Sequence, residues 1–137
     1  MSRSSWVPLI PFDVPASAVE SAFPDDPLQG ELIVHRAVDA MIAELIAQDW
    51  IAYSTRVFLS STSLSELVRL MLEQLLNPQR TNLPIQTLDV ADLYNIINRH
   101  LNDMIDALDE DHIAFDSDGL SAYVETLLQS TLQSFKN

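Results

Sequence analysis

The sequence contains no cysteine, two glycines and a single lysine among its 137 residues. Without cysteine, the protein cannot contain a disulfide framework, a thiolate zinc site, an iron–sulfur cluster or a cysteine nucleophile. The loops that cradle phosphate groups need several glycines close together, whereas Gly30 and Gly119 are far apart in the chain. These absences argue against a nucleotide-dependent enzyme.

Basic residues are scarce as a class, and this limits the partners that the protein can bind. The chain has 7 Lys and Arg against 20 Asp and Glu, which gives a formal net charge of −13. Such a surplus of negative charge repels phosphates, so we expect no direct binding to nucleic acid or to an anionic membrane.

Long apolar runs are also absent. The most apolar stretch, residues 32–47, contains charged residues and is too short to cross a bilayer. Prolines interrupt the short apolar segment near the N-terminus before it reaches the length of a signal peptide. We therefore expect a soluble cytoplasmic protein, in the host cytoplasm if the source is a virus.

The chain divides into a proline-rich arm, residues 1–28, and a helical domain, residues 29–137. Five of the seven prolines lie in the arm, which excludes a long helix there. Because the arm also carries the apolar residues Trp6 and Phe12, we expect it to lie extended across the body or across a partner. One short helical turn, from Pro15 to Phe23, is expected within it.

The remaining chain shows the apolar spacing of helices, which we predict at about 31–49, 63–77, 87–108 and 119–135. Ser63 and Glu66 fit a capping box at the start of the second of these helices, and Asn77-Pro78 ends it. The 31–49 helix is apolar on more than one side, which indicates the central helix of the core or an oligomer interface.

Residues 50–59 alternate like a strand, but the sequence offers no second strand to pair with them. We therefore interpret this segment as helical. The fold class that we predict is all-α, a single-domain bundle of four or five helices with an extended arm.

Candidate sites for metal or catalysis are incomplete. The loop at 114–125 resembles part of an EF-hand, with Asp116, Asp118 and Glu125 at the third, fifth and twelfth positions, but the first ligand position is Ala114. We interpret this loop as one in which Ser117 or Asp118 caps the last helix, and we predict no metal site and no cofactor.

The same holds for catalytic groups. His100 lies on the apolar face of its helix, so we expect a buried or half-buried core imidazole. No glycine-flanked nucleophile elbow is present among the serines. We therefore predict that the protein is not an enzyme.

The negative charge is concentrated in one part of the chain. Seven acidic residues and no Lys or Arg lie in a 16-residue window: Asp103, Asp106, Asp109, Glu110, Asp111, Asp116 and Asp118. The window carries −7 of the net charge of −13. Acids near a helix C-terminus oppose the helix dipole and so cost stability. We therefore interpret the cluster as a surface that binds a basic partner. The alternative is a solvated face that only keeps the protein soluble.

Two functions follow as hypotheses. The first is a non-enzymatic acidic protein that inhibits a basic, nucleic-acid-handling protein, with apolar anchors such as Trp6 and Phe12 slowing its release. Phage anti-defence proteins, anti-CRISPR proteins and nuclease immunity proteins offer an analogy of size, acidity and helicity only. The second is a self-assembling or chaperone-like subunit that uses the arm and the 31–49 helix as contact surfaces.

Overall fold

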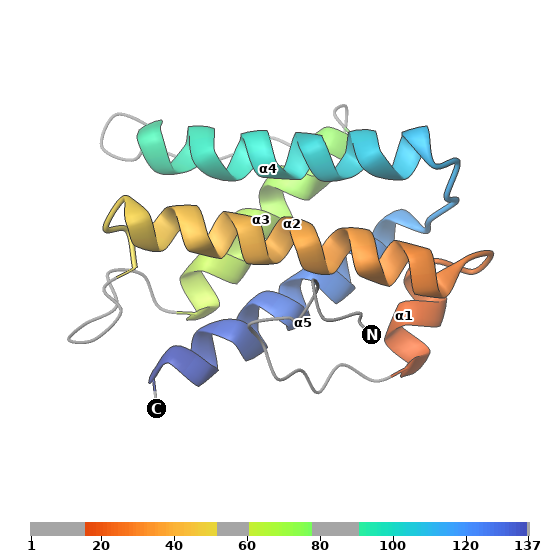
Figure 1. Cartoon of the computed structure of the whole chain (residues 1–137), viewed down its shortest axis with the longest axis horizontal. Coiled ribbons are helices and arrows are strands. Elements are labelled where there is room, and N and C mark those ends of the chain that lie inside the picture. Colours follow the sequence, from red (N-terminus) through yellow and green to blue (C-terminus); the bar gives the residue numbers. More distant parts are fainter. Residues whose placement is uncertain (1–15, 52–60, 78–90, 137) are drawn as a thin grey trace, which may run out of the picture.

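The computed structural model describes residues 16–51, 61–77 and 91–136, which form five α-helices and no strand (Figure 1). The helices are α1 (Ala16–Ala22), α2 (Pro27–Ala47), α3 (Ser61–Leu76), α4 (Ala91–Glu110) and α5 (Ser117–Lys136). The prediction of an all-α fold is confirmed. The predicted contacts of Trp6 and Phe12, and the assignment of residues 52–59, fall outside the described residues.

The four long helices form two antiparallel pairs. Helix α2 lies beside α4, and α3 crosses α5, while the short α1 packs against α5 and the start of α2 (Figure 1). Apolar side chains from all five helices fill the space between the two pairs and form one continuous core. In the described part of the chain, no helix is long and apolar enough to cross a membrane.

Helix α2 begins one turn earlier than the sequence pattern indicated. Asp26 is its N-cap, with Oδ1 accepting a hydrogen bond from the backbone N–H of Gln29 at 3.4 Å, and Pro27 occupies the first turn. Proline favours this position because its ring presets the helical φ and the first N–H of a helix has no partner within it. Gly30 therefore lies inside the helix and does not mark its start.

Part of the segment that the sequence assigned to the arm belongs to the packed core. The predicted turn near Pro15–Phe23 is present as α1, whose Val19 and Ala22 are buried together with the following Phe23. The Phe23 ring meets the Tyr123 ring edge to face, with centroids 6.2 Å apart. The α1–α2 turn is thus fastened to α5 by aromatic packing.

Both glycines of the chain are required by this same turn. A Cβ on Gly30 would lie 2.3 Å from Cγ of Phe23, and a Cβ on Gly119 would lie 2.9 Å from the carbonyl oxygen of Ser21. Neither distance is compatible with van der Waals packing, so only glycine lets α2 and α5 approach the turn this closely.

The core also contains a polar group. His35 on α2 is fully buried, with its ring 6.1 Å from that of Tyr123 and Nε2 4.0 Å from a carboxylate oxygen of Glu31. Burial lowers the pKa of His35 to about 4, because the charged imidazolium would lose its hydration. His35 is therefore neutral in the folded protein at neutral pH.

We predict that Gly30→Ala destabilises the protein by about 1–3 kcal/mol, because the Phe23 ring must leave its position. At an open helical site the same change would stabilise the protein, so a loss of stability indicates that the added methyl group meets the Phe23 ring. Urea unfolding followed by circular dichroism measures the change. Phe23→Leu in the Gly30→Ala background should recover part of the loss, and strict additivity of the two changes would contradict the contact.

Stability should also fall as the pH falls from about 6.5 towards 4. The unfolded state binds a proton at His35 near pH 6.5, whereas the folded state does so only near pH 4, so acid favours unfolding by at most about 3 kcal/mol. Urea unfolding at pH 7 and pH 5 should give a smaller loss for His35→Gln than for the original chain. The same substitution at the exposed His112 is the control.

Candidate functional site

All seven acids of the predicted patch are exposed. Asp103 and Asp106 lie within α4, Asp109 and Glu110 in its last turn, Asp111 and Asp116 in the connection to α5, and Asp118 in the first turn of α5. The structure therefore places the seven residues on α4, on the loop that follows it and in the first turn of α5.

The end of α4 is closed by a Schellman motif. The N–H of Ile113 donates to the carbonyl of Leu108 at 2.9 Å, and the N–H of His112 donates to that of Asp109 at 3.0 Å. His112 adopts a φ of 56°, a left-handed conformation that usually favours glycine. Because Leu108 and Ile113 are both buried, the motif sets the direction in which the acidic connection leaves the helix.

Asp116, and neither Ser117 nor Asp118, caps α5. Its Oδ2 accepts a hydrogen bond from the N–H of Gly119 at 2.8 Å, and its carbonyl accepts from Leu120 at 2.7 Å. The prediction that Ser117 or Asp118 caps this helix was wrong, because sequence spacing does not show which oxygen reaches the free N–H groups. The backbone N–H of Asp116 also donates to the carbonyl of Ala22 at 2.9 Å, which holds the loop against α1.

The fold adds two acids that the sequence pattern did not associate with the patch. Asp25 and Asp26 are exposed in the α1–α2 turn, which lies at the same end of the molecule as the α4–α5 connection (Figure 1). A hydrogen bond of 3.4 Å from Nε2 of Gln29 to Oδ2 of Asp111 joins the two segments across 82 positions of sequence. No short-range pattern signals such a contact.

We use the name acidic end for the exposed carboxylates gathered here: Asp25, Asp26, Asp109, Glu110, Asp111, Asp116 and Asp118. Asp26, Asp116 and Asp118 lie at helix N-termini, where negative charge is favourable. Asp109 and Glu110 lie at a C-terminus, where it is unfavourable. Helix capping therefore explains only part of the charge. Within residues 16–51, 61–77 and 91–136, no three His, Asp or Glu side chains are arranged to hold a metal ion.

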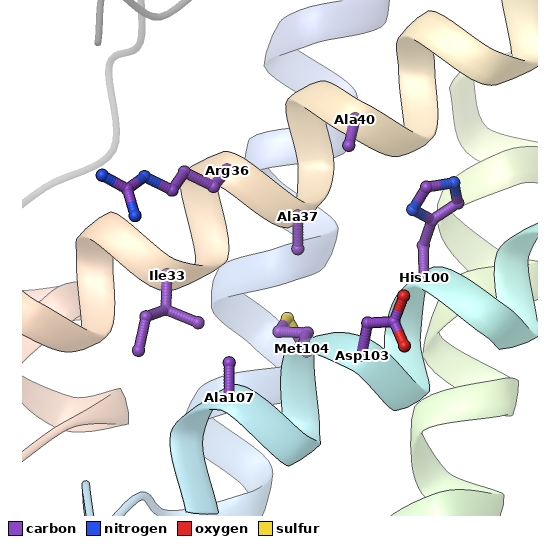
Figure 2. Close-up of a pocket in the computed structure, with 8 residues that line it drawn as sticks. All are labelled: Ile33, Arg36, Ala37, Ala40, His100, Asp103, Met104 and Ala107. Carbon is purple, nitrogen blue, oxygen red and sulfur yellow. The ribbon is translucent and has the colours of Figure 1, made fainter. Parts of the chain in front are cut away.

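Next to the acidic end, a groove of about 330 Å³ runs between α2 and α4. Figure 2 shows that α2 lines it with Ile33, Arg36, Ala37 and Ala40, and α4 with His100, Asp103, Met104 and Ala107. Arg36 and Asp103 project from different helices towards opposite sides of the groove (Figure 2). The groove thus has a largely apolar floor between a positive and a negative group.

One edge of the groove is held by a polar contact between the helices. A carboxylate oxygen of Glu44 lies 2.6 Å from Nε2 of His100, and the other accepts a hydrogen bond from Arg99 at 2.7 Å. The hydrogen bonds from Arg99 and then His100 lower the pKa of Glu44. His100 is half-buried, as predicted.

The arginines differ in their pairing. Arg69 pairs with Glu66 and Glu73 on α3, and Arg99 pairs with Glu44. Arg36 is exposed and, within the described part of the chain, makes no ion pair. Although the chain carries 20 acidic residues, none of the described ones neutralises Arg36.

Comparison with protein-family models, curated proteins and solved structures finds no match to this chain.

Neutralising the acids in the last turn of α4 and at the residue that follows it should stabilise the fold. We predict that Asp109→Asn with Glu110→Gln and Asp111→Asn raises the Tm by about 2–4 °C, since these charges oppose the helix dipole and repel one another. Thermal unfolding followed by circular dichroism measures it. Asp118→Asn, at the start of α5, should lower the Tm, and an equal effect of both changes would contradict the dipole argument.

Proposed function

We propose that this is a non-enzymatic acidic interaction protein that binds and inhibits a basic, nucleic-acid-handling protein through the acidic end. The observation that carries the proposal is the exposure of carboxylates from two distant segments at one end of the fold. A surface of one sign attracts a surface of the other sign, and the natural ligand of a basic groove is a row of phosphates.

The energetic placement of the charges supports the same proposal. Asp109 and Glu110 lie where they weaken their own helix, and natural proteins accept a loss of stability at sites that serve function. A surface needed only for solubility could carry its charges anywhere else on the fold.

An apolar contact is available beside these charges. Leu28, in the first turn of α2, is 79% exposed, and it directly follows the Asp26-Pro27 start of that helix. Charge complementarity speeds the encounter of two proteins, whereas buried apolar contacts slow their dissociation. Leu28 is therefore a candidate, within the described residues, for the apolar anchor role proposed for Trp6 and Phe12.

The proposal predicts capture of a basic protein by the immobilised chain from a lysate of its own source. Asp109→Lys with Asp111→Lys should abolish the capture, because two negative charges at the acidic end become positive and the net charge changes by four units. The matched control is Gln48→Lys, Asp92→Lys and Asn95→Lys, which changes the charge by the same amount at exposed positions of the opposite end.

The mode of capture is tested by elution. Double-stranded DNA should release the captured protein at a constant ionic strength, since it competes for the same basic surface. Release by salt but not by DNA would show that the partner is basic without being a nucleic-acid-handling protein. Equal capture by the original chain and by the acidic-end variant would exclude electrostatic mimicry.

A further inference from the structure

The groove between α2 and α4 is complementary to itself, because it carries one positive and one negative group on its two sides. Arg36 extends from α2 at one side, and the carboxylate of Asp103 projects from α4 at the other (Figure 2). A two-fold axis through the groove would place Arg36 of each copy opposite Asp103 of the other copy. A two-fold interface needs this arrangement, in which residue i contacts residue j and residue j contacts residue i.

We propose that a second copy of this chain occupies the groove, so that the protein forms a two-fold dimer through α2 and α4. Arg36 of each protomer pairs with Asp103 of the other, on either side of an apolar centre. This interface is separate from the acidic end and does not depend on the proposed inhibitory function.

The surface of α2 around the groove suits the approach of another helix. Ala40, Ala43 and Ala47 are exposed along one side of α2, and Ala37 and Ala107 lie in the groove itself. Small side chains let two helices approach closely, and their burial costs little side-chain entropy. The outer side of α4 is polar, so the apolar contact is confined to the groove and α2.

The pairing of the arginines within the described part of the chain supports the same occupant. Arg69 and Arg99 are paired within the chain, whereas Arg36 is exposed beside the groove without an ion pair in the described residues. An opposite charge on a second copy would pair with it, and Asp103 is the acidic residue that lines the same groove.

The high net charge does not prevent this dimer, because the two-fold axis separates the acidic ends. Ala37 lies near the middle of the groove, seven positions or about 10 Å of helix after Gly30, so the acidic ends of two antiparallel copies lie about 20 Å apart. Physiological salt screens exposed charges over about 8 Å. Added salt should therefore relieve the residual repulsion, while both acidic ends stay accessible.

The test is a charge swap followed by sedimentation equilibrium over a wide concentration range. The original chain should approach twice the 15.4 kDa of one protomer as its concentration rises. Arg36→Asp and Asp103→Arg should each weaken the dimer about tenfold or more, since each brings like charges together at two symmetric positions. The double variant Arg36→Asp/Asp103→Arg should restore the dissociation constant to within about threefold.

Controls and contrary outcomes separate the dimer from other occupants of the groove. Asp109→Arg makes the same charge change as Asp103→Arg outside the groove, and it should leave dimerisation at least as strong. A monomer at every concentration overturns the proposal. A dimer that the single changes leave intact, or that the double variant fails to restore, also overturns it. Circular dichroism of each variant shows whether the helices are retained, and restoration by the double variant excludes misfolding as the cause.

Discussion

The fold depends on the close packing of the α1–α2 turn against the starts of α2 and α5. Phe23 lies against Gly30, and the backbone of Ser21 and Ala22 lies against Gly119, so the two glycines of the chain serve one contact. A methyl group at either glycine would push the segments apart. Because this turn is fastened to α5, the short α1 joins the core and covers one end of the bundle.

The position of the acidic end follows from that packing. The N–H of Asp116 donates to the carbonyl of Ala22, and Asp111 accepts from Gln29, so the α4–α5 connection is held beside the α1–α2 turn. Carboxylates of both segments then face solvent together. Some of them stabilise the helices that they begin, whereas Asp109 and Glu110 destabilise the helix that they end. The proposed binding function gives a reason for keeping this destabilising charge.

Most of the helical framework could be predicted from the sequence, because it depends on local rules. Apolar spacing located the long helices, and proline placed their boundaries within a few residues. The errors arose where a tertiary contact outweighs a local preference. Gly30 lies inside α2 because Phe23 needs the space above it, and Asp116 caps α5 because the loop is anchored to α1.

The sequence by itself determined the all-helical class, the excess of acid and its concentration between Asp103 and Asp118, since composition and periodicity are properties of the chain alone. Only the tertiary structure decided that Asp25 and Asp26 join that surface, that His35 is buried, and that α2 and α4 form a groove. These features depend on contacts between residues far apart in sequence. Such contacts arise from how whole helices pack, and no short window of sequence contains that information.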